Sequence, residues 1–100
     1  MVSNIVRVGG TVTVTMPELP STGYVWGLRN IFEVGGRIVH TSFRSDDPHS
    51  EHHCASQGTR TIEVEMTKPG EYVLKFELRR SWERDVIEAQ AVNDVHVMVE

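Results

Sequence analysis

The feature that most restricts how this chain can fold is a repeated alternation of apolar and polar residues. It runs through four segments, residues 11–16, 59–67, 71–78 and 92–99. Alternation with a period of two places the apolar side chains on one face of a β-strand. No segment carries the 3.6-residue apolar repeat of an amphipathic helix of ordinary length. We therefore expect an all-β protein.

Shorter β-rich runs occupy residues 4–8, 24–28, 30–34 and 37–43. Gly35-Gly36 separates the last two runs and predicts a hairpin turn between them. Many short strands joined by Gly and Pro turns are typical of an antiparallel β-sandwich. We expect an immunoglobulin-like sandwich of about seven or eight strands, forming a single domain over residues 1–100.

The alternation also predicts which side chains form the core. Tyr72 follows Pro69-Gly70 at a strand start, as does the tyrosine corner of immunoglobulin-like sandwiches. Two polar segments, residues 44–58 and 79–89, are expected to be surface connections. The predicted core residues are Val12, Val14, Met16, Tyr24, Trp26, Ile62, Val64, Met66, Tyr72, Leu74, Phe76, Leu78, Val95, Val97 and Val99.

Charge and composition exclude several classes of partner. A formal net charge of −4 disfavours nucleic acid and gives no attraction to anionic membranes. The single cysteine, Cys54, excludes an internal disulfide. The first seven residues lack the apolar core of a signal peptide, so we expect a cytoplasmic protein, or an exported one whose signal has been removed. We also expect a monomer.

Residues 19–26 form a stiff, small-surfaced loop followed by two aromatic residues. Pro20 fixes its own φ, and Gly23 permits a positive φ and a close neighbour. Tyr24 and Trp26 have strand spacing and anchor the exit of the loop in the core. Because the loop holds no base, nucleophile or metal ligand, it suits docking rather than chemistry. We expect neither enzymatic activity nor a cofactor.

Three segments resemble the loops of chagasin-like inhibitors of papain-family cysteine peptidases. Residues 19–26 resemble the Asn-Pro-Thr-Thr-Gly-Tyr-x-Trp loop, with Leu19 in place of asparagine and Ser21 in place of the first threonine. Residues 80–82 resemble the Arg-Pro-Trp loop, with Ser81 in place of proline. Residues 55–58 match the Gly-x-Gly-Gly loop weakly, through Gly58.

The resemblance implies a reversible, competitive inhibitor that blocks the active cleft with three loops at one end of the sandwich. Ser21, Thr22 and Gly23 would approach the catalytic cysteine–histidine pair. Trp82 would pack on the primed side, and Arg80 would hold that loop or pair with an acid of the enzyme. The implied peptidase-binding residues are Pro20, Ser21, Thr22, Gly23, Tyr24, Ala55, Ser56, Gln57, Gly58, Arg80, Ser81 and Trp82.

Two other functions remain open from the residues alone. An immunoglobulin-like interaction module without inhibitory activity could use the same loop end, because this fold hosts many functions. His49, His52, His53 and Cys54 are residue types that bind zinc. Neighbours on one loop rarely close a tetrahedral site, so we expect a solvated His-rich loop rather than a metal site.

Overall fold

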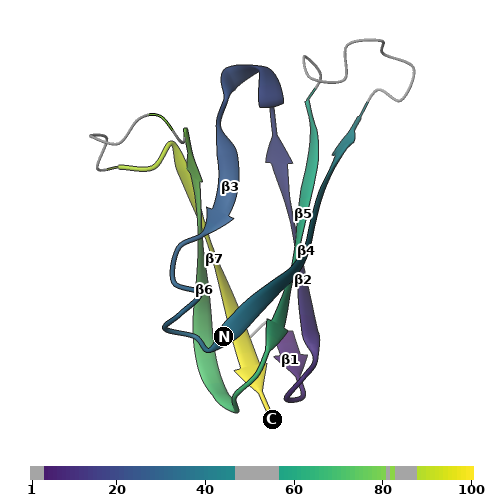
Figure 1. Cartoon of the computed structure of the whole chain (residues 1–100), viewed down its shortest axis with the longest axis vertical. Helices are drawn as coiled ribbons and strands as arrows, with labels where there is room; N and C mark the ends of the chain where they lie inside the picture. The colour runs from purple at the N-terminus through teal and green to yellow at the C-terminus, as the bar shows by residue number, and fades with distance from the viewer. Residues whose placement is uncertain (1–3, 47–56, 81, 83–87) are drawn as a thin grey trace.

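The computed structural model describes residues 4–46, 57–80, 82 and 88–100. These residues form strands and one short 3₁₀ helix, η1, and the strands make two facing sheets (Figure 1). The elements are β1 (Asn4–Val6), β2 (Thr11–Glu18), η1 (Pro20–Thr22), β3 (Val25–Leu28), β4 (Gly36–Ser45), β5 (Gly58–Met66), β6 (Gly70–Arg79) and β7 (Ala91–Val99).

One sheet has the order β1-β7-β6-β3 and the other has the order β2-β5-β4. Neighbouring strands are antiparallel except β1, which pairs with β7 in parallel. The expected all-β sandwich is therefore confirmed, with one parallel pair at a sheet edge. Within the described ranges, no helix has the length and apolar character needed to cross a bilayer.

The core lies between the sheets and follows the predicted alternation. Val12, Val14 and Met16 of β2 face Leu74 and Phe76 of the other sheet's β6 across the buried interior. Of the predicted core residues, Tyr24, Tyr72, Leu78 and Val95 are only half-buried. The hydroxyl of Tyr72 donates a hydrogen bond to the Pro69 carbonyl (2.9 Å), the backbone contact that defines a tyrosine corner.

The predicted hairpin around Gly35-Gly36 is wrong. Residues 31–35 form turns, and β3 and β4 lie in different sheets. The reason is Asn30, whose side chain donates to the Val73 carbonyl (2.8 Å) and accepts from the Lys75 amide (3.0 Å). The side chain of Asn30 thereby occupies backbone groups of β6 that a longer β3 would bind, so β3 ends and the chain leaves this sheet. Val34 then fills the end of the core instead of alternating in a strand.

The predicted long loop at residues 44–58 is shorter than expected, because Arg44 and Ser45 belong to β4 and Gly58 opens β5. Arg44 pairs with Thr59, and Ser45 pairs with Gly58. A side chain at Gly58 would overlap the Arg44 carbonyl and the Phe43 ring. The absence of a Cβ at this position lets the two strands close together.

Glu77 of β6 lies between two arginines on the outer side of the first sheet. Its carboxylate contacts Arg29 Nε at 2.9 Å and accepts a hydrogen bond from Arg79 Nε at 3.0 Å. The hydrogen bond from Arg79, together with the positive charges of Arg79 and Arg29, lowers the pKa of Glu77 below its usual range against an opposing effect of burial. Glu77 thus pairs with one arginine of its own strand and with another just beyond the end of β3.

We expect Glu77→Gln to lower the melting temperature at pH 7 by about 2–5 °C, since partly exposed ion pairs each contribute at most ~1 kcal/mol. A carboxyl whose pKa is depressed by folding stabilises above its unfolded-state pKa, and the contribution is lost as pH falls through the folded-state pKa. The difference between parent and variant should therefore vanish towards about pH 2 in thermal scans. An equal difference at both pH values would contradict this account.

Candidate functional site

The strand ends that bound three connections lie at the same end of the sandwich (Figure 1). We call residues 19–24 the first loop, residues 46–57 the second loop and residues 80–90 the third loop. Glu18, before the first loop, pairs with Gly58, after the second. Val25, after the first loop, pairs with Arg79, before the third. The strand registers therefore place the first loop between the stems of the other two.

The first loop is held by its own backbone and by Thr22. Leu19 is extended (φ −118°, ψ 96°), and its carbonyl accepts hydrogen bonds from the Thr22 amide (3.1 Å) and hydroxyl (2.7 Å). The same hydroxyl accepts from the Tyr24 amide at 3.3 Å. Gly23 donates to the Pro20 carbonyl (2.9 Å) and ends the turn at φ 81°, a left-handed conformation that favours glycine. The Leu19 side chain makes no capping hydrogen bond.

The first and third loops are in direct contact. The indole ring of Trp82 lies so close to Gly23 that a Cβ at residue 23 would overlap it. Arg80 Nε donates to the Thr22 carbonyl at 2.7 Å. The Arg80 guanidinium lies 4.2 Å from the centroid of the Tyr24 ring and 5.8 Å from that of Trp82. Trp82 nevertheless keeps 65% of its surface exposed. The two loops thus form one surface with an exposed indole.

Beneath the first loop, a buried carboxylate joins the two sheets. Glu18, 3% exposed at the end of β2, accepts a hydrogen bond from the Trp26 amide of β3 at 3.1 Å. Arg60 of β5 binds the same carboxylate with Nε (3.2 Å to each oxygen) and a terminal nitrogen (2.8 Å). The indole N–H of Trp26 donates to the Pro17 carbonyl at 2.8 Å. Among the described residues, no buried side-chain nitrogen or oxygen is left without a partner.

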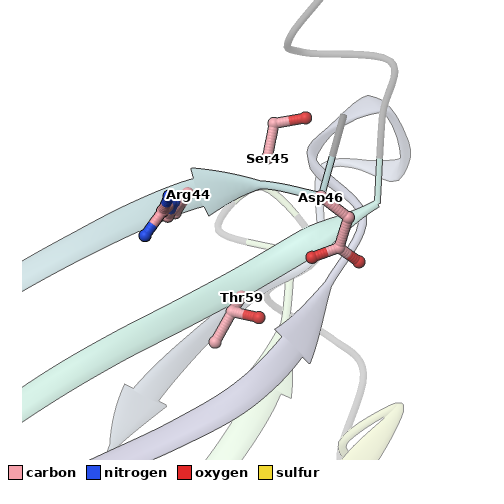
Figure 2. Close-up of a pocket in the computed structure, with 4 residues that line it drawn as sticks. All are labelled: Arg44, Ser45, Asp46 and Thr59. Atoms are coloured by element: carbon pink, nitrogen blue, oxygen red, sulfur yellow. The ribbon is translucent and has the colours of Figure 1, made fainter. Parts of the chain in front are cut away.

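The space between the loop stems is hollowed. A hollow of about 310 Å³ is lined by residues from both sheets, namely Pro17, Glu18, Leu19, Thr22, Tyr24, Gln57, Leu78 and Gln90. A second hollow of about 320 Å³ lies at the base of the second loop, between Arg44, Ser45, Asp46 and Thr59 (Figure 2). There the Asp46 amide donates to the Gln57 carbonyl at 3.0 Å and extends the β4–β5 pairing.

The structure brings most of the predicted site residues to this end. Pro20, Ser21, Thr22, Gly23 and Tyr24 make up the first loop beside Arg80 and Trp82. Gln57 is exposed there, whereas Gly58 is buried. Ala55, Ser56 and Ser81 lie outside the described residues, as do His49, His52, His53 and Cys54. In the part of the chain that the structure describes, no group of three or more His, Cys, Asp or Glu side chains could hold a metal ion.

Sequence analysis did not single out Glu18 and Arg60. The sequence nevertheless contained a clue to both residues, because each occupies an inward-facing position of an alternating strand. Glu18 follows Val14 and Met16 at a spacing of two, and Arg60 precedes Ile62 and Val64 in the same way. Two opposite charges in phase with the core, at the ends of two strands, indicate a buried ion pair.

The fold and its loop end define an immunoglobulin-like sandwich with one shared surface built from loops. The model of the chagasin family of peptidase inhibitors, I42, matches residues 5–97. The chain therefore belongs to the chagasin family, whose members are inhibitors and not enzymes.

Solved structures show the same fold. The cysteine protease inhibitor EhICP2 from Entamoeba histolytica superposes with a TM-score of 0.72 at 18% identity, over 97% of this chain and 87% of that one. Amebosin superposes with a TM-score of 0.63 at 21% identity, over 96% of this chain and 86% of its own. A search of curated protein sequences found no significant match.

We expect Glu18→Ala to destabilise the protein by about 3–5 kcal/mol, because it leaves Arg60 and the Trp26 amide without their partner in a buried place. The free energy of unfolding in urea measures this loss. Glu65→Ala is the matched control, since Glu65 pairs with Arg37 (3.1 Å) at a more exposed position on β5. The control should cost less than about 1 kcal/mol. Equal losses of unfolding free energy in the two variants would show that the Glu18 contacts between the sheets do not stabilise the fold.

Proposed function

We propose that this chain is a reversible, competitive inhibitor of papain-like cysteine peptidases, whose three loops together block the active cleft. Membership of the chagasin family supports inhibition of a peptidase. The similar fold of EhICP2, a cysteine protease inhibitor, supports the class of enzyme. The observation that carries the proposal is the joined surface of the first and third loops, with Trp82 against Gly23 and Arg80 bound to Thr22.

The first loop is suited to occupy a cleft without being cleaved. A cysteine peptidase needs a carbonyl carbon in attack geometry, with its oxygen free to enter the oxyanion hole. The carbonyls of Leu19, Pro20 and Thr22 already accept hydrogen bonds inside the protein. The 3₁₀ turn and Pro20 also depart from the extended conformation of a bound substrate. These features favour a stable complex over turnover.

The same contacts favour tight binding. A loop that is ordered before it binds loses less conformational entropy in the complex. Exposed tryptophans at the centre of an interface are frequent hot spots. Trp82 is exposed, its ring packs against Gly23 and it lies near Arg80, which supports such a role for it.

In this proposal each loop has its own part of the cleft. Ser21, Thr22 and Gly23 face the catalytic cysteine and histidine. Trp82 packs on the primed side, while Arg80 holds the third loop against the first. The second loop, with Gln57 at its end, lies along the non-primed side. One chain binds one enzyme molecule.

We expect Trp82→Ala to raise the inhibition constant for papain at least about tenfold, since hot-spot truncations cost roughly 2 kcal/mol or more. A steady-state assay with a fluorogenic substrate measures the change. Phe32→Ala is the control, because Phe32 is 96% exposed in the β3–β4 connection at the other end of the sandwich. Unchanged inhibition by the Trp82 variant would remove Trp82 from the site. A parent protein that inhibits no papain-like enzyme would favour the non-inhibitory interaction module instead.

We expect Gly23→Val to weaken inhibition more than Trp82→Ala does. A β-branched residue is strained at φ 81°, and its Cβ would displace the Trp82 ring, so both loops are disturbed. Gly27→Val is the matched control, since a Cβ at Gly27 meets no atom within 4 Å and the residue lies within β3. The same assay on papain compares the two. Equal inhibition by the two valine variants would contradict the role given to Gly23.

A further inference from the structure

The hollow between the loop stems has no role in the contacts described so far. It lies between the two sheets at the loop end, with Leu78 on one side and Gln57 on the other. Leu19 and Tyr24 contribute apolar surface from the first loop, and the amide side chains of Gln57 and Gln90 lie at exposed positions. Its volume of about 310 Å³ is at the lower limit for small-molecule pockets, which hold ~300–1,000 Å³.

The lining of the hollow selects the kind of group that fits. Among the described residues that line it, Glu18 carries a charge, and its carboxylate is bound by Arg60 and the Trp26 amide. A cation entering the hollow would have to compete with Arg60, and an anion would meet the Glu18 carboxylate. An uncharged apolar group meets neither obstacle and buries the exposed faces of the leucines.

We propose that this hollow receives one uncharged, apolar side chain from the wall of the target peptidase's cleft, and that Leu19 sets this preference. The inference rests on the proposed function, since it assigns a receiving site within the same interface. The hollow is continuous with the first loop through Leu19, Thr22 and Tyr24, so an enzyme that contacts that loop lies over its mouth.

Leu19 is free for this task because its side chain does not hold the loop. Its carbonyl makes the structural hydrogen bonds, and the side chain, with the residue 38% exposed, lines the hollow. Leu19 stands where the inhibitor motif that residues 19–26 resemble has asparagine. Leucine here removes a polar group from the mouth of the hollow and adds apolar contact area.

The test compares Leu19→Asn and Leu19→Met with the parent against papain, by stopped-flow association and by dissociation into excess substrate. We expect Leu19→Asn to dissociate about tenfold faster while the association rate changes less than about twofold. Leu19→Met keeps an apolar side chain of similar volume and should stay within about threefold of the parent. Phe32→Asn, the control at the opposite end, should match the parent.

The direction of the change separates this inference from a structural role for residue 19. Asparagine is a preferred N-cap residue and would stabilise the turn at Pro20. If residue 19 acted only as a cap, Leu19→Asn would inhibit as well as the parent or better, and that result would overturn the receiving site. If the parent itself did not inhibit, both the proposed function and the receiving site would be overturned.

A second variant tests the hollow from another part of its lining. Gln90 is exposed and lines the hollow away from the first loop. We expect Gln90→Trp to fill the space and weaken inhibition about tenfold with Leu19 intact. Weakening by Leu19→Asn without any effect of Gln90→Trp would show that Leu19 contacts the enzyme outside the hollow, which contradicts the proposal.

Discussion

The carboxylate of Glu18 is the group on which the loop end of this protein depends. The strands before and after the first loop, β2 and β3, belong to different sheets, so no β-ladder can join them. Glu18 bridges them by accepting the Trp26 amide, and Arg60 compensates its charge from β5. A buried ion pair gains little over an apolar pair because both charges lose water. Its value here is geometric, since it fixes the separation of the two sheets where the loops emerge.

That contact allows the framework and the exposed surface of the first and third loops to be separate parts of the molecule. The two tryptophans illustrate the division. Trp26 is buried, and both of its nitrogens bond to the end of β2. Trp82 is exposed and rests on the tip of the first loop. Gly23 connects the framework to this surface. Because Gly23 has no side chain, the Trp82 ring of the third loop can pack on the turn, and Glu18 holds the strand that follows the turn.

Much of this fold could be predicted from the sequence, because alternation reports which side chains face the core. It succeeded for β2, β5, β6 and β7, where one face is buried. It failed at residues 30–34, because a single side-chain amide, Asn30, replaced strand pairing and redirected the chain. The charges of Glu18 and Arg60 were in phase with the core, but their third partner is a backbone amide in the other sheet. No local sequence pattern predicts the hydrogen bond between Glu18 and the Trp26 amide, because it joins two sheets. The hollow between the loop stems could not be predicted for the same reason.

The departures of the first loop from the family motif have a physical explanation in its hydrogen bonds. The Thr22 hydroxyl supports the backbone hydrogen bonds of the turn, because it both donates to the Leu19 carbonyl and accepts from the Tyr24 amide. The motif positions that must be kept are therefore the ones that hold the backbone, Pro20, Thr22 and Gly23. Residue 19 contributes to the turn through its carbonyl, which every amino acid has. Its side chain can therefore vary without loss of these hydrogen bonds, whereas a change at Thr22 or Gly23 would alter the shape of the loop itself.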